Sequence, residues 1–214
     1  MEIRRNFYLD KLIKRKNNGL IKVITGIRRC GKSYLLNNLF YHHLLESGVA
    51  ADHIIRFAFD SADDLYRIGE SLIGIEKEKR GVDPEKFMAY VRTKVVDDGM
   101  YYLLLDEIQM LDCFEAVLNS YLRKDNMDVF VTGSNAKLLS KDIATEFAGR
   151  GDEVHMYPLS FAEFMSVYKG DKYMGLSEYM LYGGIPLVVL RDGANDKAAA
   201  LQNLFSEIYI QDIC

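Results

Sequence analysis

The residues with the clearest chemical pattern form a run that begins with glycine and ends with lysine and serine. This run is Gly26, Ile27, Arg28, Arg29, Cys30, Gly31, Lys32 and Ser33, which matches GxxxxGK[ST] at every specified position. Glycines let the backbone wrap closely around phosphate oxygens, and the helix that follows presents its positive amino end to them. A lysine at this place reaches the β- and γ-phosphates of a nucleotide, and the serine hydroxyl binds Mg²⁺. The run therefore predicts a phosphate-binding loop, or P-loop, for ATP with Mg²⁺.

Within this loop, Lys32 is expected on the phosphates and Ser33 on the metal ion. Tyr34 follows as a further expected contact of the nucleotide. Arg28 and Arg29 face either the phosphates or solvent, and the sequence leaves this open.

Two acidic residues follow an apolar run further along the chain. Residues 101–105 are all apolar or aromatic, which is typical of a strand covered on both faces, and Asp106 and Glu107 come next. Ligands of parallel sheets bind at the carboxyl ends of the strands. We expect Asp106 to hold Mg²⁺ through water, and Glu107 to orient and deprotonate the attacking water. The alternative is that the pair only caps the next helix.

Two further polar segments follow the next predicted strand. Ser134 and Asn135 come directly after Thr132 and Gly133, where a hydroxyl or amide can bond the γ-phosphate or the attacking water. These residue types also suit an ordinary turn and helix N-cap. Arg150 stands between two glycines and can stabilise a phosphoryl transition state, within one subunit or in a neighbour. A solvated loop arginine is the alternative.

Strands and helices that alternate through the first 158 residues must position these groups. Apolar runs predict strands at residues 20–25, 54–59, 101–105, 129–132 and 153–157. Periodic patterns predict helices at residues 3–17, 32–46, 61–79, 84–97, 113–124 and 136–147. Such alternation implies a five-stranded, mostly parallel sheet between two layers of helices, a three-layer α/β/α P-loop NTPase core.

From residue 159 the pattern contains helices alone, expected at residues 160–168, 175–182 and 194–213. We therefore expect two units: an ATPase core of residues 1–158, with an amphipathic amino-terminal helix, and a small helical lid of residues 159–214. The last helix keeps an apolar face to the end of the chain, which fits both a truncated longer protein and a natural terminal helix.

The composition argues against several classes of protein. The 214 residues are 49% hydrophobic and 27% charged, as in an ordinary globular protein. No apolar run approaches the roughly 20 residues of a membrane helix, and the amino terminus lacks the pattern of a secretory signal. Three widely spaced cysteines without a CxxC pair indicate neither a disulfide framework nor a zinc site. We expect a cytoplasmic protein with reduced thiols and no membrane partner.

The net charge of −4 is unevenly distributed along the chain. Residues 1–32 carry ten lysines and arginines against two acidic residues, so the remainder carries 17 basic and 29 acidic residues. A basic face attracts phosphates or nucleic acid. Solvated lysines on the first helix, together with the basic residues of the P-loop, account for the same excess. A protein partner or DNA is therefore left open.

These motifs together resemble the AAA superfamily of P-loop ATPases. The group with the greatest resemblance comprises bacterial and archaeal AAA-like proteins in which an ATPase domain precedes a C-terminal domain of unknown function. The matching segments, which span nearly the whole chain, are residues 26–33, 104–109, 132–136, 148–151, 157–164 and 183–186. The last two are the most specific to this group. The resemblance implies that members continue beyond residue 214 and that their C-terminal domain is missing here.

The resemblance also implies roles for individual residues. It gives Asp106 the Mg²⁺ role, Glu107 the general-base role, and Asn135 or Ser134 the sensor role. Arg150 resembles an arginine placed near the γ-phosphate, often at a subunit boundary, and this leaves a homo-oligomer open. Pro186 resembles a proline near adenine, while Cys30 stands where other members often carry valine or another small residue.

We therefore expect a protein that hydrolyses Mg-ATP to ADP and phosphate and couples its nucleotide state to a conformational change. The alternative is a slow or non-hydrolysing switch, gated by nucleotide, that binds a partner or DNA. Glu107 argues against a purely passive binder, because binding alone does not need that carboxylate. A P-loop kinase is less favoured, because no acceptor-binding feature stands out.

Overall fold

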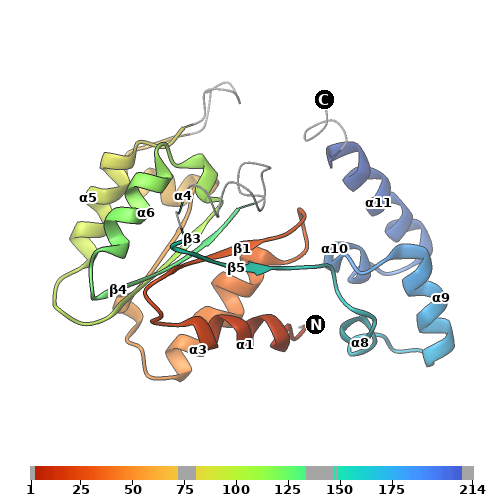
Figure 1. The fold of residues 1–214 in the computed structure, drawn as a ribbon. Helices are drawn as coiled ribbons and strands as arrows, with labels where there is room; N and C mark the ends of the chain where they lie inside the picture. Colours follow the sequence, from red (N-terminus) through yellow and green to blue (C-terminus); the bar gives the residue numbers. More distant parts are fainter. Residues whose placement is uncertain (1–2, 72–80, 134–146, 148, 209–214) are drawn as a thin grey trace.

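The central element of the computed structural model, which describes residues 3–71, 81–133, 147 and 149–208, is one five-stranded sheet (Figure 1). Its order is β2-β3-β4-β1-β5, and every neighbouring pair is parallel. The strands are β1 (Ile21–Thr25), β2 (Ile54–Ala58), β3 (Tyr101–Asp106), β4 (Met127–Thr132) and β5 (Gly151–His155). The carboxyl ends of all strands therefore meet at one edge, which brings together the P-loop and the acidic pair.

Helices cover both faces of the sheet, and this confirms the predicted three-layer α/β P-loop NTPase fold. One face carries α4 (Ala62–Arg67), α5 (Pro84–Lys94) and α6 (Phe114–Leu122). The other face carries α1 (Asn6–Arg15) and the helical segment that follows the P-loop. That segment is α2 (Lys32–Tyr34), η1 (Leu35–Phe40) and α3 (Tyr41–Glu46), of which η1 is a π-helix. Short 3₁₀ turns, η2 (Ala51–His53) and η4 (Ile108–Met110), complete this part of the chain.

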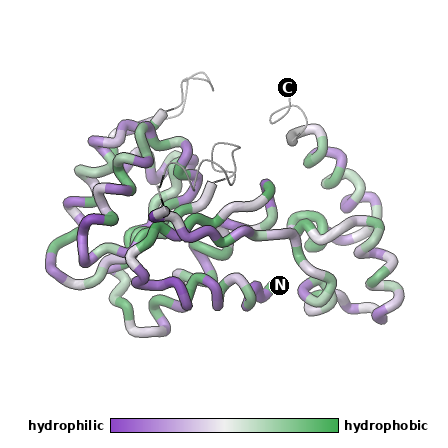
Figure 2. The backbone as a smooth tube through the Cα atoms, viewed as in Figure 1, coloured by the Kyte–Doolittle hydropathy of each residue, from purple (hydrophilic) through white to green (hydrophobic). Residues whose placement is uncertain are grey.

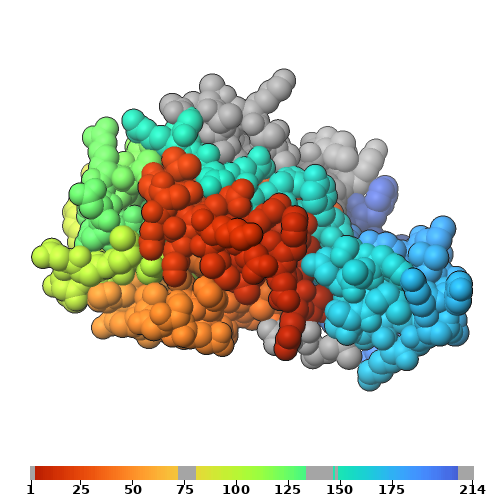
Figure 3. Space-filling view, turned by 60° about the horizontal axis from the view of Figure 1, so that its bottom comes forward, coloured from red at the N-terminus to blue at the C-terminus, as the bar shows by residue number. Residues whose placement is uncertain are grey.

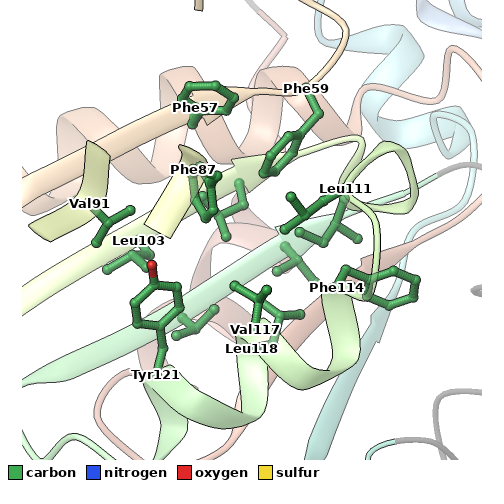
Figure 4. Close-up of a cluster of buried hydrophobic side chains, with 14 of the residues drawn as sticks. Phe57, Phe59, Phe87, Val91, Leu103, Leu111, Phe114, Val117, Leu118 and Tyr121 are labelled. Atoms are coloured by element: carbon green, nitrogen blue, oxygen red, sulfur yellow. The ribbon is translucent and has the colours of Figure 1, made fainter. Parts of the chain in front are cut away.

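The central strand β3 shows why its sequence is an unbroken apolar run. Leu103 and Leu105 point into the core beneath α5 and α6, which also contains Phe57 and Phe87 (Figure 4). Leu104 points into a second core on the opposite face. Alternating residues of one strand therefore enter two different cores, as the predicted double coverage requires.

In the described part of the chain after β5, four helices lie together beyond the carboxyl end of this strand (Figure 1). They are α8 (Phe161–Met165), α9 (Lys172–Tyr182), α10 (Pro186–Val189) and α11 (Ala194–Ile208). Phe164 of α8 packs against Tyr179 of α9 with ring centroids 5.4 Å apart. Figure 2 shows apolar residues along these helices as well as in the sheet. The helical part thus has apolar packing of its own.

Several predicted boundaries were wrong, for identifiable physical reasons. The helix expected at residues 61–79 ends at Arg67, because Gly69 adopts a φ of +70° and the next N–H, of Glu70, bonds back to the Leu65 carbonyl. Strand β5 begins and ends two residues earlier than predicted, in register with β1 from Ile21 to Thr25. Helix α10 was not predicted at all. The helix expected at residues 136–147 lies outside the described residues except for Phe147, which is in a turn.

Candidate functional site

The P-loop follows β1 directly and owes its shape to left-handed backbone positions. Gly26 has a φ of +138°, and a Cβ on it would lie 2.2 Å from the carbonyl oxygen of Met156. Gly31 has a φ of +101° and precedes the first helical residue, Lys32. Both positions therefore need glycine, because L side chains rarely adopt these backbone angles and the first site has no room for one. Ile27, Arg29 and Tyr34 are exposed on the loop, and Arg28 is half-buried.

The ammonium of Lys32 is held against the loop itself. Its Nζ donates to the carbonyl of Gly26 at 2.8 Å and to that of Ile27 at 3.1 Å. The residue is only 5% exposed. An ammonium has three N–H donors, so it can hold these carbonyls and a phosphate oxygen together. The geometry suits a lysine fixed inside a phosphate-binding loop.

The carboxylate of Asp106 is the meeting point of three polar side chains from different elements. The Ser33 hydroxyl donates to Oδ1 at 3.1 Å, and the Asn37 amide donates to Oδ2 at 3.2 Å. The Thr132 hydroxyl, at the end of β4, also donates to Oδ1. Burial raises the pKa of the Asp106 carboxyl above its usual value, while the hydroxyls of Thr132 and Ser33 oppose this shift. Three donors thus fix one buried acid beside the P-loop serine.

This set of oxygens fits Mg²⁺, which prefers hard oxygen ligands and keeps several of its waters. Ser33 and Asp106 would hold the ion together with the phosphates and water. Among the described residues, no group of three or more His, Cys, Asp or Glu side chains is placed to bind a metal.

Glu107 adopts a left-handed conformation with a φ of +54°, which is uncommon for a residue other than glycine. Its N–H donates to the Thr132 hydroxyl at 3.2 Å, so one hydroxyl bridges Asp106 and Glu107. The side-chain amide of Gln109 donates to the Glu107 carboxylate. Burial, and then the charge of Glu107, raise the pKa of Asp60, which lies just beyond the end of β2. The acidic residues therefore gather at the carboxyl edge of the sheet.

Sequence reasoning missed three residues of this site: Thr132, Asn37 and Gln109. The segment that starts at Thr132 was recognised, but its hydroxyl was not assigned a contact. Asn37 lies in the π-helix η1, and such segments often occur at functional sites, although nothing in the sequence marks this one. Ser134 and Asn135, the expected sensors, lie outside the described residues.

Two other predicted residues belong to elements outside the P-loop and the acidic pair. Arg150 is exposed, donates to Oδ1 of Asn119 at 3.3 Å, and precedes β5, where its carbonyl bonds the first N–H of β1. The length of β1, about 16 Å at roughly 3.3 Å per residue, separates it from the P-loop of its own chain. Pro186 begins α10. The next residue of this helix, Leu187, lines a cavity of about 160 Å³ together with Arg29 of the P-loop and with Arg191, Ala200, Asn203 and Leu204.

The similarity to known proteins agrees with this geometry. The model of the AAA domain family matches residues 18–165, more than half of the chain, and the chain belongs to this family. Among solved structures, a Walker-type ATPase of Pyrococcus abyssi is 16% identical, with a TM-score of 0.60 over 98% of this chain and 73% of that one. The ORC1 protein of Aeropyrum pernix, solved in complex with DNA, is 13% identical, with a TM-score of 0.51 over 99% and 61%. At these identities the likeness is one of fold.

Curated relatives extend the similarity across the whole chain. An uncharacterized protein of Haemophilus influenzae is 35% identical over 99% of this chain and 50% of its own length. An uncharacterized protein of Methanocaldococcus jannaschii is 28% identical over 95% of this chain and 43% of its own length. The chain thus spans half or less of the length of these relatives. Within the described residues, no helix is both long and apolar enough to cross a membrane.

Proposed function

We propose that the chain binds Mg-ATP at the P-loop and hydrolyses it to ADP and phosphate. The observation that carries this proposal is the contact between Ser33 and Asp106, whose side-chain oxygens lie 3.1 Å apart. The adjacent Lys32 donates a hydrogen bond to the carbonyl of Gly26 in the same loop. Serine after a P-loop lysine and a buried acid at the carboxyl end of another strand of the same sheet, here β3, are the two protein groups that an Mg-nucleotide site requires. AAA-family membership supports nucleotide binding in the same loop.

Each residue then has a defined task. Lys32 neutralises charge on the β- and γ-phosphates, and the loop N–H groups bind their oxygens. Ser33 and Asp106 hold Mg²⁺, which neutralises charge on the phosphates when it is bound. Glu107 accepts a hydrogen bond from the attacking water and takes its proton. The Thr132 hydroxyl keeps the two acids in a fixed relation, and Ser134 or Asn135 senses the γ-phosphate.

Two parts of the chain outside this reaction centre regulate the nucleotide site. The helices of residues 159–214 act as a lid over the nucleotide, with Pro186 near adenine, and convert nucleotide state into motion. Arg150 acts on the nucleotide of a neighbouring copy. Its side chain starts at the amino edge of the sheet and does not reach the P-loop of its own chain. This role requires a homo-oligomer.

A slow nucleotide switch is the second candidate function. The observation that favours it is the contact of the Gln109 amide with the Glu107 carboxylate, which occupies the proposed base. A base held in this way has to be released before it can accept a proton from water. Turnover is then low until a partner or a second copy displaces the amide.

DNA is a less favoured partner than the basic count of residues 1–32 suggests. Arg5, Arg15 and Lys22 pair with acidic side chains within the fold, and Lys32 is bound to the loop. The Aeropyrum pernix ORC1 protein was solved in complex with DNA, but it is only 13% identical to this chain. We therefore propose a protein as an alternative partner to DNA.

The test is phosphate release from Mg-ATP, measured for the parent chain, for Glu107→Gln and for the control Glu46→Gln. Glu46 is an exposed residue at the end of α3, away from the acidic edge. Hydrolysis predicts turnover in the parent and the control, with ATP binding but little phosphate release in Glu107→Gln. Tight ATP binding without phosphate release in any of the three supports the switch instead. Absence of ATP binding refutes both candidates.

A further inference from the structure

A buried arginine near the amino terminus contacts three parts of the nucleotide-binding region at once. Arg5 is only 3% exposed. Its Nη1 donates to the carbonyl of Cys30 in the P-loop at 3.0 Å, and its Nη2 donates to the carbonyl of Tyr157 at 2.7 Å. Its Nε lies 2.8 Å from Oε1 of Glu163, forming an ion pair with α8. Figure 3 shows the red amino-terminal segment directly against the teal residues that leave β5 and enter α8.

The contact with the P-loop supplies a hydrogen-bond donor to a buried carbonyl of that loop. Cys30 is fully buried and lies between two left-handed residues, Arg29 and Gly31, with φ values of +63° and +101°. Such alternation turns successive N–H groups toward a bound anion, so carbonyls of the same loop turn away from it. A buried carbonyl needs a donor from the protein. The Arg5 guanidinium is the donor to the Cys30 carbonyl.

The contact with α8 is equally specific. Oε2 of Glu163 accepts hydrogen bonds from the N–H and the hydroxyl of Ser160, at 2.8 and 2.9 Å, and so closes a capping box. Its other oxygen pairs with Arg5. Tyr8 reinforces the junction, because its hydroxyl accepts the N–H of Tyr157 at 3.1 Å and its ring centroid lies 4.7 Å from the Arg5 guanidinium. The first turn of α8 is thereby fixed to the residue that holds the P-loop.

We propose that Arg5 is a positioning residue for the P-loop and couples the shape of this loop to the orientation of α8. The inference rests on the proposed function, since ATP affinity is the property that the loop shape sets. A planar guanidinium has donors in fixed directions, and a lysine ammonium cannot reproduce them. Loss of this fork leaves the Cys30 carbonyl without its donor, and the loop relaxes from the shape that binds phosphates. ATP binding in turn restrains the first turn of α8.

The test compares Arg5→Lys with Arg15→Lys by titration of the whole chain with a fluorescent ATP analogue. Arg15 is a matched control, because it also joins α1 to the β5 region through an ion pair, with Asp152 at 2.7 Å. We expect Arg5→Lys to weaken ATP binding roughly tenfold, the effect of losing one charge-assisted hydrogen bond of about 1.4 kcal/mol. Arg15→Lys should change the affinity less than about twofold, because this half-buried side chain bonds Asp152 and the Lys11 carbonyl rather than the P-loop.

A second variant and a second readout separate positioning from a merely structural role. Glu163→Gln keeps a side chain that can close the capping box but removes the ion pair. It should weaken ATP binding, with no further loss when it is combined with Arg5→Lys. Hydrogen exchange at residues 157–165 should slow on addition of ATP in the parent and not in Arg5→Lys.

The outcomes distinguish this inference from the proposed function. If the parent binds ATP and Arg5→Lys binds it as tightly as Arg15→Lys, the positioning role is refuted and the proposed function stands. If the parent binds no ATP, the proposed function fails and the inference fails with it. Additive effects of Arg5→Lys and Glu163→Gln would refute the coupling to α8.

Discussion

The hydroxyl of Thr132 joins the two acids of the site, and its removal tests this arrangement quantitatively. Thr132 is fully buried at the end of β4, donates to Asp106 and accepts the N–H of Glu107 at 3.2 Å. Thr132→Val replaces the hydroxyl by a methyl group of similar size. The N–H of the half-buried Glu107 then lacks its acceptor, which costs about 1–3 kcal/mol, and the carboxylate of Asp106 loses one donor. We expect the free energy of unfolding to fall by about 3 kcal/mol.

Thr132→Ser is the matched control, since it keeps the hydroxyl and removes one buried methyl group worth about 1 kcal/mol. Denaturant unfolding measures the stability of both variants, and phosphate release from Mg-ATP measures their activity. Because misplacement of catalytic groups by about 1 Å can cost 100-fold in rate, Thr132→Val should release phosphate roughly 10- to 100-fold more slowly than Thr132→Ser. Equal stability and equal rates in the two variants would refute the bridging role of this hydroxyl.

Three further substitutions test other contacts. Asp106→Asn should raise the free energy of unfolding near neutral pH, because burial raises the pKa of this carboxyl and so makes its charged form costly. The parent should gain stability as pH falls through that raised pKa toward the unfolded value of 3.8, a gain that Asp106→Asn lacks; urea unfolding at several pH values measures it. Gly26→Ala should abolish ATP binding in a titration, because its Cβ would lie 2.2 Å from the Met156 carbonyl oxygen. Asp128→Asn should lower the free energy of unfolding by about 3 kcal/mol, because the fully buried Lys22 ammonium then keeps only neutral partners, such as the Leu20 carbonyl, and loses its ion pair. Burial lowers the Lys22 pKa, so this loss should shrink as pH rises toward 10.5, which unfolding curves at alkaline pH would show.

The fold could be predicted because its local signals agree with its global arrangement. The unbroken apolar run of β3 predicted coverage on both faces, and α3 ends at the predicted residue, Glu46, just before Gly48 with its φ of +91°. Gly69 carried the same signal for α4 and was overlooked. The strand order could not be predicted, because it depends on which strands pack together and not on any one segment.

The candidate site also contains residues that could be predicted from the sequence and residues that could not. The P-loop and the acidic pair each consist of consecutive residues, so the residue types and spacing within each motif indicate its chemistry directly. Thr132, Asn37 and Arg5 act through partners that are 26, 69 and up to 158 residues away. Nothing local marks such a residue, because a buried threonine or arginine has many structural uses. The π-helix that carries Asn37 likewise has no sequence signal that we can identify.

Calorimetric titration of the chain with ATP, with and without Mg²⁺, beside the variant Lys32→Met, tests directly whether the P-loop is the nucleotide site. We expect a single ATP site in the parent, which Mg²⁺ strengthens. We expect at least a tenfold weaker affinity in Lys32→Met, about 1.4 kcal/mol or more, because the side chain that neutralises the phosphates is gone. Thermal unfolding confirms that both proteins are folded. An unchanged ATP affinity in a folded Lys32→Met variant would contradict the claim that this loop is the nucleotide site.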